Sequence, residues 1–171
     1  MMSKSLAIGM AFAAVLAVAS FSARAGDDDN PAALAKALSA ATVSLEQGLK
    51  ASEGEGKPIS GKFEVQDGAL QLSVYTMKKD QFAEVLVDHN SGLIQYSQPI
   101  TDPDDLKDAK EQGEAMAKAK LSLAAAVASA VTAHNGFRAV SAVPMLDGGQ
   151  PVASVTLIYG EEVKKVTEKL D

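Results

Sequence analysis

The chain has 171 residues, of which 47 % are hydrophobic and 22 % are charged, with a formal net charge of −6. It contains no cysteine, which excludes disulfides and thiol chemistry. An acidic chain without lysine and arginine clusters is also a poor partner for nucleic acid or anionic lipid, because both bind clustered basic residues.

The N-terminus has the pattern of a secretory signal peptide. Lys4 precedes an uninterrupted run of apolar and small residues, and Ala23-Arg24-Ala25 supplies the small residues expected before a cleavage point. The alternative is a membrane anchor, but the run is short for a bilayer span, which needs about 18 or more apolar residues. We expect residues 1–25 to be cleaved near Ala25, leaving a periplasmic or secreted chain without a stable membrane anchor. That chain keeps all 22 acidic residues and 14 of the 16 basic ones, a formal charge of −8.

A helical region should follow the acidic leader. Asn30 has the character of an N-cap, with Pro31 at the first helical position. Ser44-Leu45-Glu46-Gln47 has the form of a capping box, which predicts a break near residues 42–43. The glycines and proline of residues 54–58 should end the helix.

From Ile59 the hydrophobic period changes to two, which is typical of half-buried strands. Asp67-Gly68, residues 78–80 and residues 90–92 have turn compositions, so they divide this region into an antiparallel meander. One face of the predicted sheet is apolar and the other carries mostly polar side chains.

Residues 101–105 form an acidic link and the expected boundary between two modules. Aspartates are favoured at a helix N-terminus, so a helix should begin here and run to Lys120. We expect this helix to be mostly exposed, because it is rich in Ala, Lys and Glu. A second helix over 122–134 and three strands over 137–145, 152–159 and 162–170 complete the chain. The spacing of the last segment also fits a helix.

The second half of the chain repeats the first. Residues 63–68 (FEVQDG) correspond to residues 143–148 (VPMLDG), and Ser73-Val74 corresponds to Ser154-Val155. The repeat favours a strand for the last segment, because it aligns that segment with a strand of the first half. A duplicated small unit is typical of a scaffold that presents a surface, since one short copy buries little core.

The order helix, hairpin and strand, with Val87-Asp88-His89-Asn90-Ser91-Gly92-Leu93-Ile94 at its end, resembles the PepSY module. Residues 165–171 resemble another variant of that ending. The sequence thus predicts an α+β protein of two tandem PepSY-like modules, 26–100 and 101–171, each a helix with a three- to four-stranded antiparallel sheet. The resemblance implies an exported, non-catalytic protein, since PepSY modules are associated with peptidase propeptides that restrain a protease. The arrangement is also similar in outline to the beta-lactamase inhibitory proteins.

The chain carries no recognisable catalytic motif, so we predict that it is not an enzyme. The two histidines, His89 and His134, belong to no metal-binding pattern, and no serine lies in a Gly-x-Ser-x-Gly elbow. No cofactor is expected unless a hard cation such as calcium or a lanthanide binds the acidic link. Carboxylates at short spacing could supply its oxygen ligands: Asp102, Asp104, Asp105 and Asp108. The other interpretation of these aspartates is helix capping alone.

The leading candidate surface is the polar face of the first predicted sheet, opposite the helices. Its expected partner-binding residues are Lys62, Glu64, Gln71, Ser73, Tyr75, Phe82 and Glu84. A half-polar face with aromatic residues has the composition of a protein interface. The alternatives are a solvated sheet and packing between the modules. We expect this face to dock an envelope protein such as a peptidase, as a peptidase inhibitor would, whereas the sequence leaves the oligomeric state open.

Overall fold

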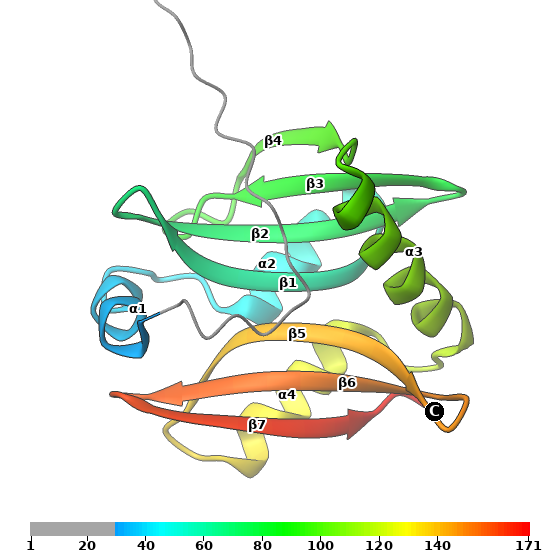
Figure 1. The fold of residues 1–171 in the computed structure, drawn as a ribbon. Helices are drawn as coiled ribbons and strands as arrows, with labels where there is room; N and C mark the ends of the chain where they lie inside the picture. The colour runs from blue at the N-terminus through cyan, green and yellow to red at the C-terminus, as the bar shows by residue number, and fades with distance from the viewer. Residues whose placement is uncertain (1–29) are drawn as a thin grey trace, which may run out of the picture.

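The computed structural model describes residues 30–171, so the predicted signal peptide lies outside the described residues. The described chain is an α+β structure with four α-helices and one seven-stranded antiparallel sheet (Figure 1). The helices are α1 (Pro31–Leu38), α2 (Leu45–Ala51), α3 (Pro103–Lys118) and α4 (Leu123–Ala133), with a 3-10 turn, η1 (Ser52–Gly54), after α2. The strands are β1 (Lys57–Gln66), β2 (Ala69–Lys78), β3 (Gln81–Val87), β4 (Ile94–Pro99), β5 (Arg138–Asp147), β6 (Gln150–Tyr159) and β7 (Glu162–Lys169).

Both halves of the chain contribute to the same sheet, whose strand order is β4-β3-β2-β1-β5-β6-β7. The halves meet where β1 and β5 pair antiparallel, with Gly61 opposite Ala142 and Lys62 opposite Ser141. The remaining neighbours are hairpins or successive strands, as a meander requires. The final segment is the edge strand β7, which confirms the strand prediction.

Local signals place the starts of α1 and α2 where the sequence predicts them, whereas α1 ends at Leu38, before the predicted break. The Asn30 side chain accepts hydrogen bonds from the backbone of Ala32 and Ala33. Ser44 and Gln47 form both hydrogen bonds of the capping box, so α1 and α2 are separate helices with a break between them. These contacts lie within three residues along the chain, which is why sequence alone predicted them.

The turn after β3 is also built as expected. Asp88 Oδ1 accepts hydrogen bonds from the backbone of Ser91 at 2.7 Å and of Asn90 at 3.0 Å, and Gly92 has a φ of 75°. The backbone hydrogen bond from Ser91, followed by its hydroxyl and the Asn90 backbone, lowers the pKa of Asp88 to about 2. The His89 carbonyl of the same turn accepts from the backbone of Thr42 and Val43, so the turn also holds the loop between α1 and α2.

Helices α2 and α4 contact each other and cover one face of the sheet; they lie behind it in Figure 1. Gly61 marks the closest approach, since a Cβ placed there would lie 3.0 Å from Leu49 Cδ2 and 3.2 Å from Leu45 Cδ1 of α2. One apolar cluster fills this layer and includes side chains from both halves, among them Phe63 and Leu157. The core is therefore shared by the two halves.

Helix α3 packs on the other face of the sheet, where it contacts β1 and β5, and it lies on the right in Figure 1. Ser60 of β1 donates a hydrogen bond to Gln112 Oε1 at 2.7 Å, and a Cβ at Gly113 would lie 3.0 Å from Met77 Sδ. The expectation of a mostly exposed helix is therefore wrong. The side of α3 that meets the sheet is made of small and polar residues with few large apolar ones, so a hydrophobic pattern could not indicate its burial.

Arg138 ties the start of β5 to the first half of the chain. Its guanidinium donates hydrogen bonds to the carbonyls of Leu38 at 2.7 Å and Ala41 at 3.3 Å, with the Val43 carbonyl at 3.5 Å. All three carbonyls belong to the end of α1 and the loop that follows it. A single side chain thus joins segments about 100 residues apart in sequence.

Over residues 30–171, no single helix has both the length and the apolar character needed to cross a membrane. Helices α3 and α4 taken together meet the requirement by length and composition, but they are bent by 83° at the break between them.

Candidate functional site

The polar residues predicted to bind a partner lie on one face of three neighbouring strands. Strand register places Lys62 opposite Ser73, and Glu64 opposite Gln71, across β1 and β2. It also places Tyr75 opposite Glu84 across β2 and β3, where Phe82 lies two residues from Glu84 on the same face. Because Ser60 on this face of β1 bonds to Gln112, the face is the one on which α3 packs.

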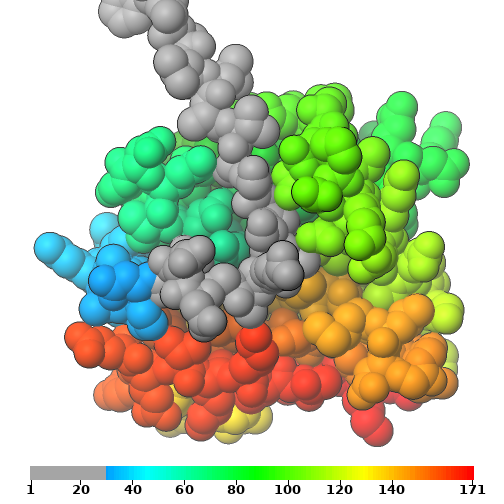
Figure 2. All heavy atoms as spheres, in the orientation of Figure 1, coloured from blue at the N-terminus to red at the C-terminus, as the bar shows by residue number. Residues whose placement is uncertain are grey.

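Several of these residues are not exposed, which corrects the expectation of an open sheet face opposite all helices. The exposed fractions are 0 % for Ser73, 1 % for Tyr75 and 3 % for Glu84. Phe82 is half-buried and lies beside Gly113 of α3. In the space-filling view, α3 stands over the right side of this face (Figure 2). The sequence prediction did not place α3 on this face, and so it overestimated the exposure of these side chains.

The main feature of the face is a set of oxygen atoms without hydrogen-bond partners. Seven buried side-chain polar atoms of the described residues make no hydrogen bond, and five of them lie here on adjacent strands. The five are Glu64 Oε1, Gln66 Oε1, Gln71 Oε1, Ser73 Oγ and Glu84 Oε1. We call Glu64, Gln66, Gln71, Ser73 and Glu84 the acceptor face. Since a buried polar atom without a partner costs about 1–3 kcal/mol, such a concentration needs an explanation.

The two carboxylates of the acceptor face are each half satisfied. Glu64 Oε2 lies 3.2 Å from Lys62 Nζ, and Glu84 Oε2 accepts a hydrogen bond of 3.1 Å from Gln98 Nε2 of β4. The second oxygen of each carboxylate has no such contact. Each carboxylate therefore has one buried oxygen without a hydrogen-bond donor.

Glu84 is in an unfavourable place for a negative charge. Burial raises the pKa of Glu84 above its usual value of 4.5, and the charges of Glu64 and Asp105 raise it further. The hydrogen bond from Gln98 opposes this shift, as does the Ser73 hydroxyl. Ser73 Oγ lies near Glu84 without completing a hydrogen bond to it.

Glu84→Gln should stabilise the protein at neutral pH. Glu84 has a higher pKa in the folded chain than its usual value, so keeping it ionised above that folded pKa costs folding free energy. We expect Tm to rise by roughly 2–4 °C at pH 7, the effect of about 1 kcal/mol in a chain of this length. The gain should shrink as the pH falls through the raised folded pKa of Glu84, and it should vanish below the usual value of 4.5. Thermal unfolding between pH 4 and 8 tests this, with the exposed Glu111→Gln as the control. A lower Tm at neutral pH would contradict the expectation.

The acidic link forms the start of α3. Asp102 Oδ1 accepts hydrogen bonds from the backbone of Asp104 at 2.9 Å and of Asp105 at 3.2 Å, which makes Asp102 the N-cap. Asp105 is 5 % exposed and acts electrostatically on Glu84, whereas Asp108 lies one turn further along α3. Within residues 30–171, no group of three or more His, Asp or Glu side chains converges in a way that could hold a metal ion. Cation binding therefore stays a prediction.

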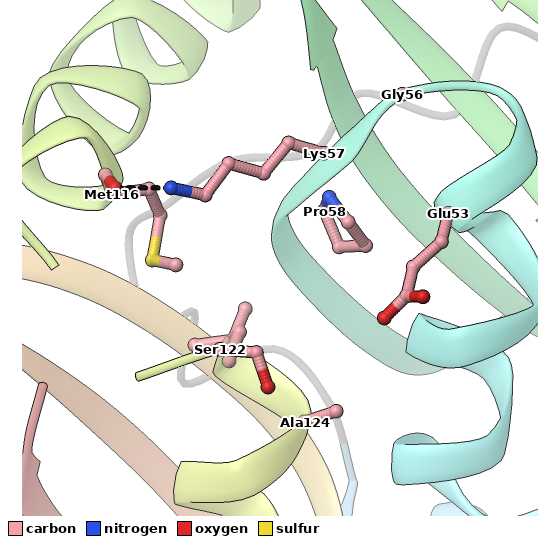
Figure 3. A pocket seen from close by; sticks show the side chains of 8 residues that line it. Glu53, Gly56, Lys57, Pro58, Met116, Ser122 and Ala124 are labelled. Carbon is pink, nitrogen blue, oxygen red and sulfur yellow. Dashed lines mark hydrogen bonds between the residues drawn. The ribbon is translucent and has the colours of Figure 1, made fainter. Parts of the chain in front are cut away.

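A small hollow lies away from the acceptor face, where η1, the start of β1, the end of α3 and the start of α4 meet (Figure 3). Its volume is about 160 Å³, and its lining residues are Glu53, Gly56, Lys57, Pro58, Met116, Ser122, Leu123 and Ala124. Lys57 Nζ donates to the Met116 carbonyl and Ser122 caps α4, which leaves the Glu53 carboxylate as the remaining charged group of the lining. A single carboxylate gives the hollow few groups for binding or catalysis.

Sequence reasoning missed Gln66, Gln98 and Asp105 as members of this site. Gln66 follows Glu64 in the alternation of β1, so the period of two could have identified it. Gln98 and Asp105 reach the site only through the pairing of β4 and the docking of α3. No local signal indicates either contact.

Comparisons with protein-family models, with curated proteins and with solved structures found no match for this chain. Fold and site together describe an α+β protein with a polar acceptor face on the side of the sheet where α3 packs. The PepSY resemblance, the localisation and the absence of enzymatic activity stay predictions.

Proposed function

We propose that this chain is a non-catalytic binding protein of the cell envelope, made of two tandem PepSY-like modules that share one sheet. In this proposal it docks or restrains another envelope protein, such as a peptidase, through the acceptor face. The proposal is supported by the sequence resemblance and by the order of the elements. Both halves run from helix to hairpin to a further strand.

The observation that carries the proposal is the group of five unpartnered oxygens on β1, β2 and β3. If these residues served packing alone, apolar side chains would do so without the cost of buried polar atoms. A docked chain would supply the missing hydrogen-bond donors. Residues retained at a cost to stability are expected where a protein binds.

Photo-crosslinking from the acceptor face tests this function in the cell. Benzoylphenylalanine would replace Gln71, which is half-buried on the acceptor face, or the exposed Gln150 at the β5–β6 turn as the matched control. Irradiation should give a protein adduct of discrete mass from position 71 but not from position 150. Adding Glu84→Gln should reduce that adduct. The docking proposal fails if position 71 gives no adduct, or if both positions give the same one, provided that circular dichroism shows a folded chain.

A further inference from the structure

We infer that the acceptor face binds an extended basic segment of a partner protein, with a lysine or arginine side chain directed at Glu84. This inference rests on the proposed function and adds the chemistry of the partner. Three features support it: the unpartnered oxygens, the charges around them and their placement on three strands.

The first step concerns the type of hydrogen bond that is missing. The amides of Gln66 and Gln71 can turn, and the Ser73 hydroxyl can rotate, so these groups can either donate or accept. An ionised carboxylate can only accept, and both Glu64 Oε1 and Glu84 Oε1 are unpartnered. The ligand must therefore carry donors.

The second step concerns charge. Glu64 is paired with Lys62, whereas the side chain that donates to Glu84 is the neutral amide of Gln98. Burial is the main cause of the raised pKa of Glu84, and the charges of Glu64 and Asp105 add to it. A neutral donor would satisfy the oxygens but leave this charge. An ammonium or guanidinium group supplies both, and hydrogen bonds between ions are about twice as strong as neutral ones.

The third step concerns size. On β2, Gln71 and Tyr75 are the partners of Glu64 and Glu84, so the two glutamates are four residues apart along the sheet. At about 3.3 Å per residue, the backbones of the two glutamates are roughly 13 Å apart along the strand direction. Strand β2 also lies between β1 and β3. One metal ion needs all its oxygen ligands at about 2.3–2.6 Å and cannot serve both glutamates. A peptide of several residues can, with its cationic head at Glu84 and further N–H donors toward Glu64.

Binding of synthetic peptides to the full chain, purified from the envelope fraction, tests the inference. The probe is a fluorescent Gly-Arg-Ser-Arg-Gly peptide, and the matched control carries citrulline in place of both arginines. Fluorescence anisotropy should show binding that weakens as salt is raised. The citrulline peptide should bind about tenfold more weakly or worse, and Glu84→Gln should cost about tenfold for the arginine peptide, which corresponds to about 1.4 kcal/mol. Glu111→Gln should leave its affinity unchanged.

The outcomes separate this inference from the docking proposal. Equal binding of the citrulline peptide would overturn the requirement for a cation. Displacement of the probe by spermidine at equal affinity would overturn the peptide in favour of a small polyamine. Failure of the arginine peptide to bind, with a discrete crosslink from position 71 in the cell, would overturn the basic segment and leave the docking proposal standing. Failure of both measurements would overturn both.

Discussion

Arg138→Ala should lower the free energy of unfolding by about 2–3 kcal/mol. Hydrogen bonds from a charged group are worth about 1.5–3 kcal/mol, and the guanidinium makes two short enough to count, to Leu38 and Ala41. In a chain of this length, Tm should fall by roughly 5–10 °C. Urea unfolding monitored by circular dichroism measures the change directly.

The controls for this prediction separate the bond geometry from the charge. Arg138→Lys keeps the charge but cannot reach two carbonyls at once in the same fork, so it should restore only part of the loss. Lys107→Ala removes a cation of the exposed pair with Glu111, whose atoms are 4.0 Å apart, and should change stability by less than about 1 kcal/mol. If Arg138→Ala and Lys107→Ala lowered the free energy of unfolding by the same small amount, the hydrogen bonds of Arg138 would contribute nothing to stability.

Gly61→Val should destabilise the fold by about 3 kcal/mol, although valine is favoured over glycine in strands. Strand propensity alone would give a gain of up to about 1 kcal/mol. Against this, the first carbon of the new side chain would lie 3.0 Å from Leu49 Cδ2, and its two methyl groups would reach further into α2. Leu45 and Leu49 are 1 % and 0 % exposed, so neither can move into solvent. Overpacking of a filled core costs about 1–3 kcal/mol and sometimes more, so the steric cost should decide the sign.

Gly54→Val is the matched control for this substitution. A Cβ at Gly54 meets no atom within 4 Å, so the same side chain enters open space there. We expect a change in Tm of no more than about 2 °C for Gly54→Val and a fall of roughly 6–12 °C for Gly61→Val. Equal effects of the two variants would show that backbone propensity, and not contact with α2, governs both positions.

The opposite expectations for Arg138 and Glu84 follow from the partners each charge has. The Arg138 guanidinium is matched by carbonyls, so removing it should destabilise the fold. Glu84 has one unpartnered oxygen in a buried, negative site, so Glu84→Gln should stabilise the fold while weakening the proposed binding. A variant that gains stability and loses affinity would distinguish a binding residue from one that serves the core.

Most of the local structure could be predicted from the residues themselves. The cap at Asn30, the capping box at Ser44 and the turn at Asp88 depend on contacts within a few residues, and all three are as expected. The alternation of β1, β2 and β3 also placed the candidate site residues on a common face. Short-range hydrogen bonds and a period of two are properties of the sequence, and they need no knowledge of the rest of the chain.

Tertiary structure alone decided what surrounds that face. The pairing of Gly61 with Ala142 joins the halves into one sheet, and no pattern near either residue indicates the other. The buried side of α3 includes Gln112 and Gly113 beside Ala109 and Met116, so only one of these four residues is large and apolar. The docking of α3 brings Asp105 toward Glu84, and Ser73 and Tyr75 on the same face are buried. The sequence therefore determined which side chains share the face, whereas contacts between distant segments determined its burial and charge, because both depend on what packs against it.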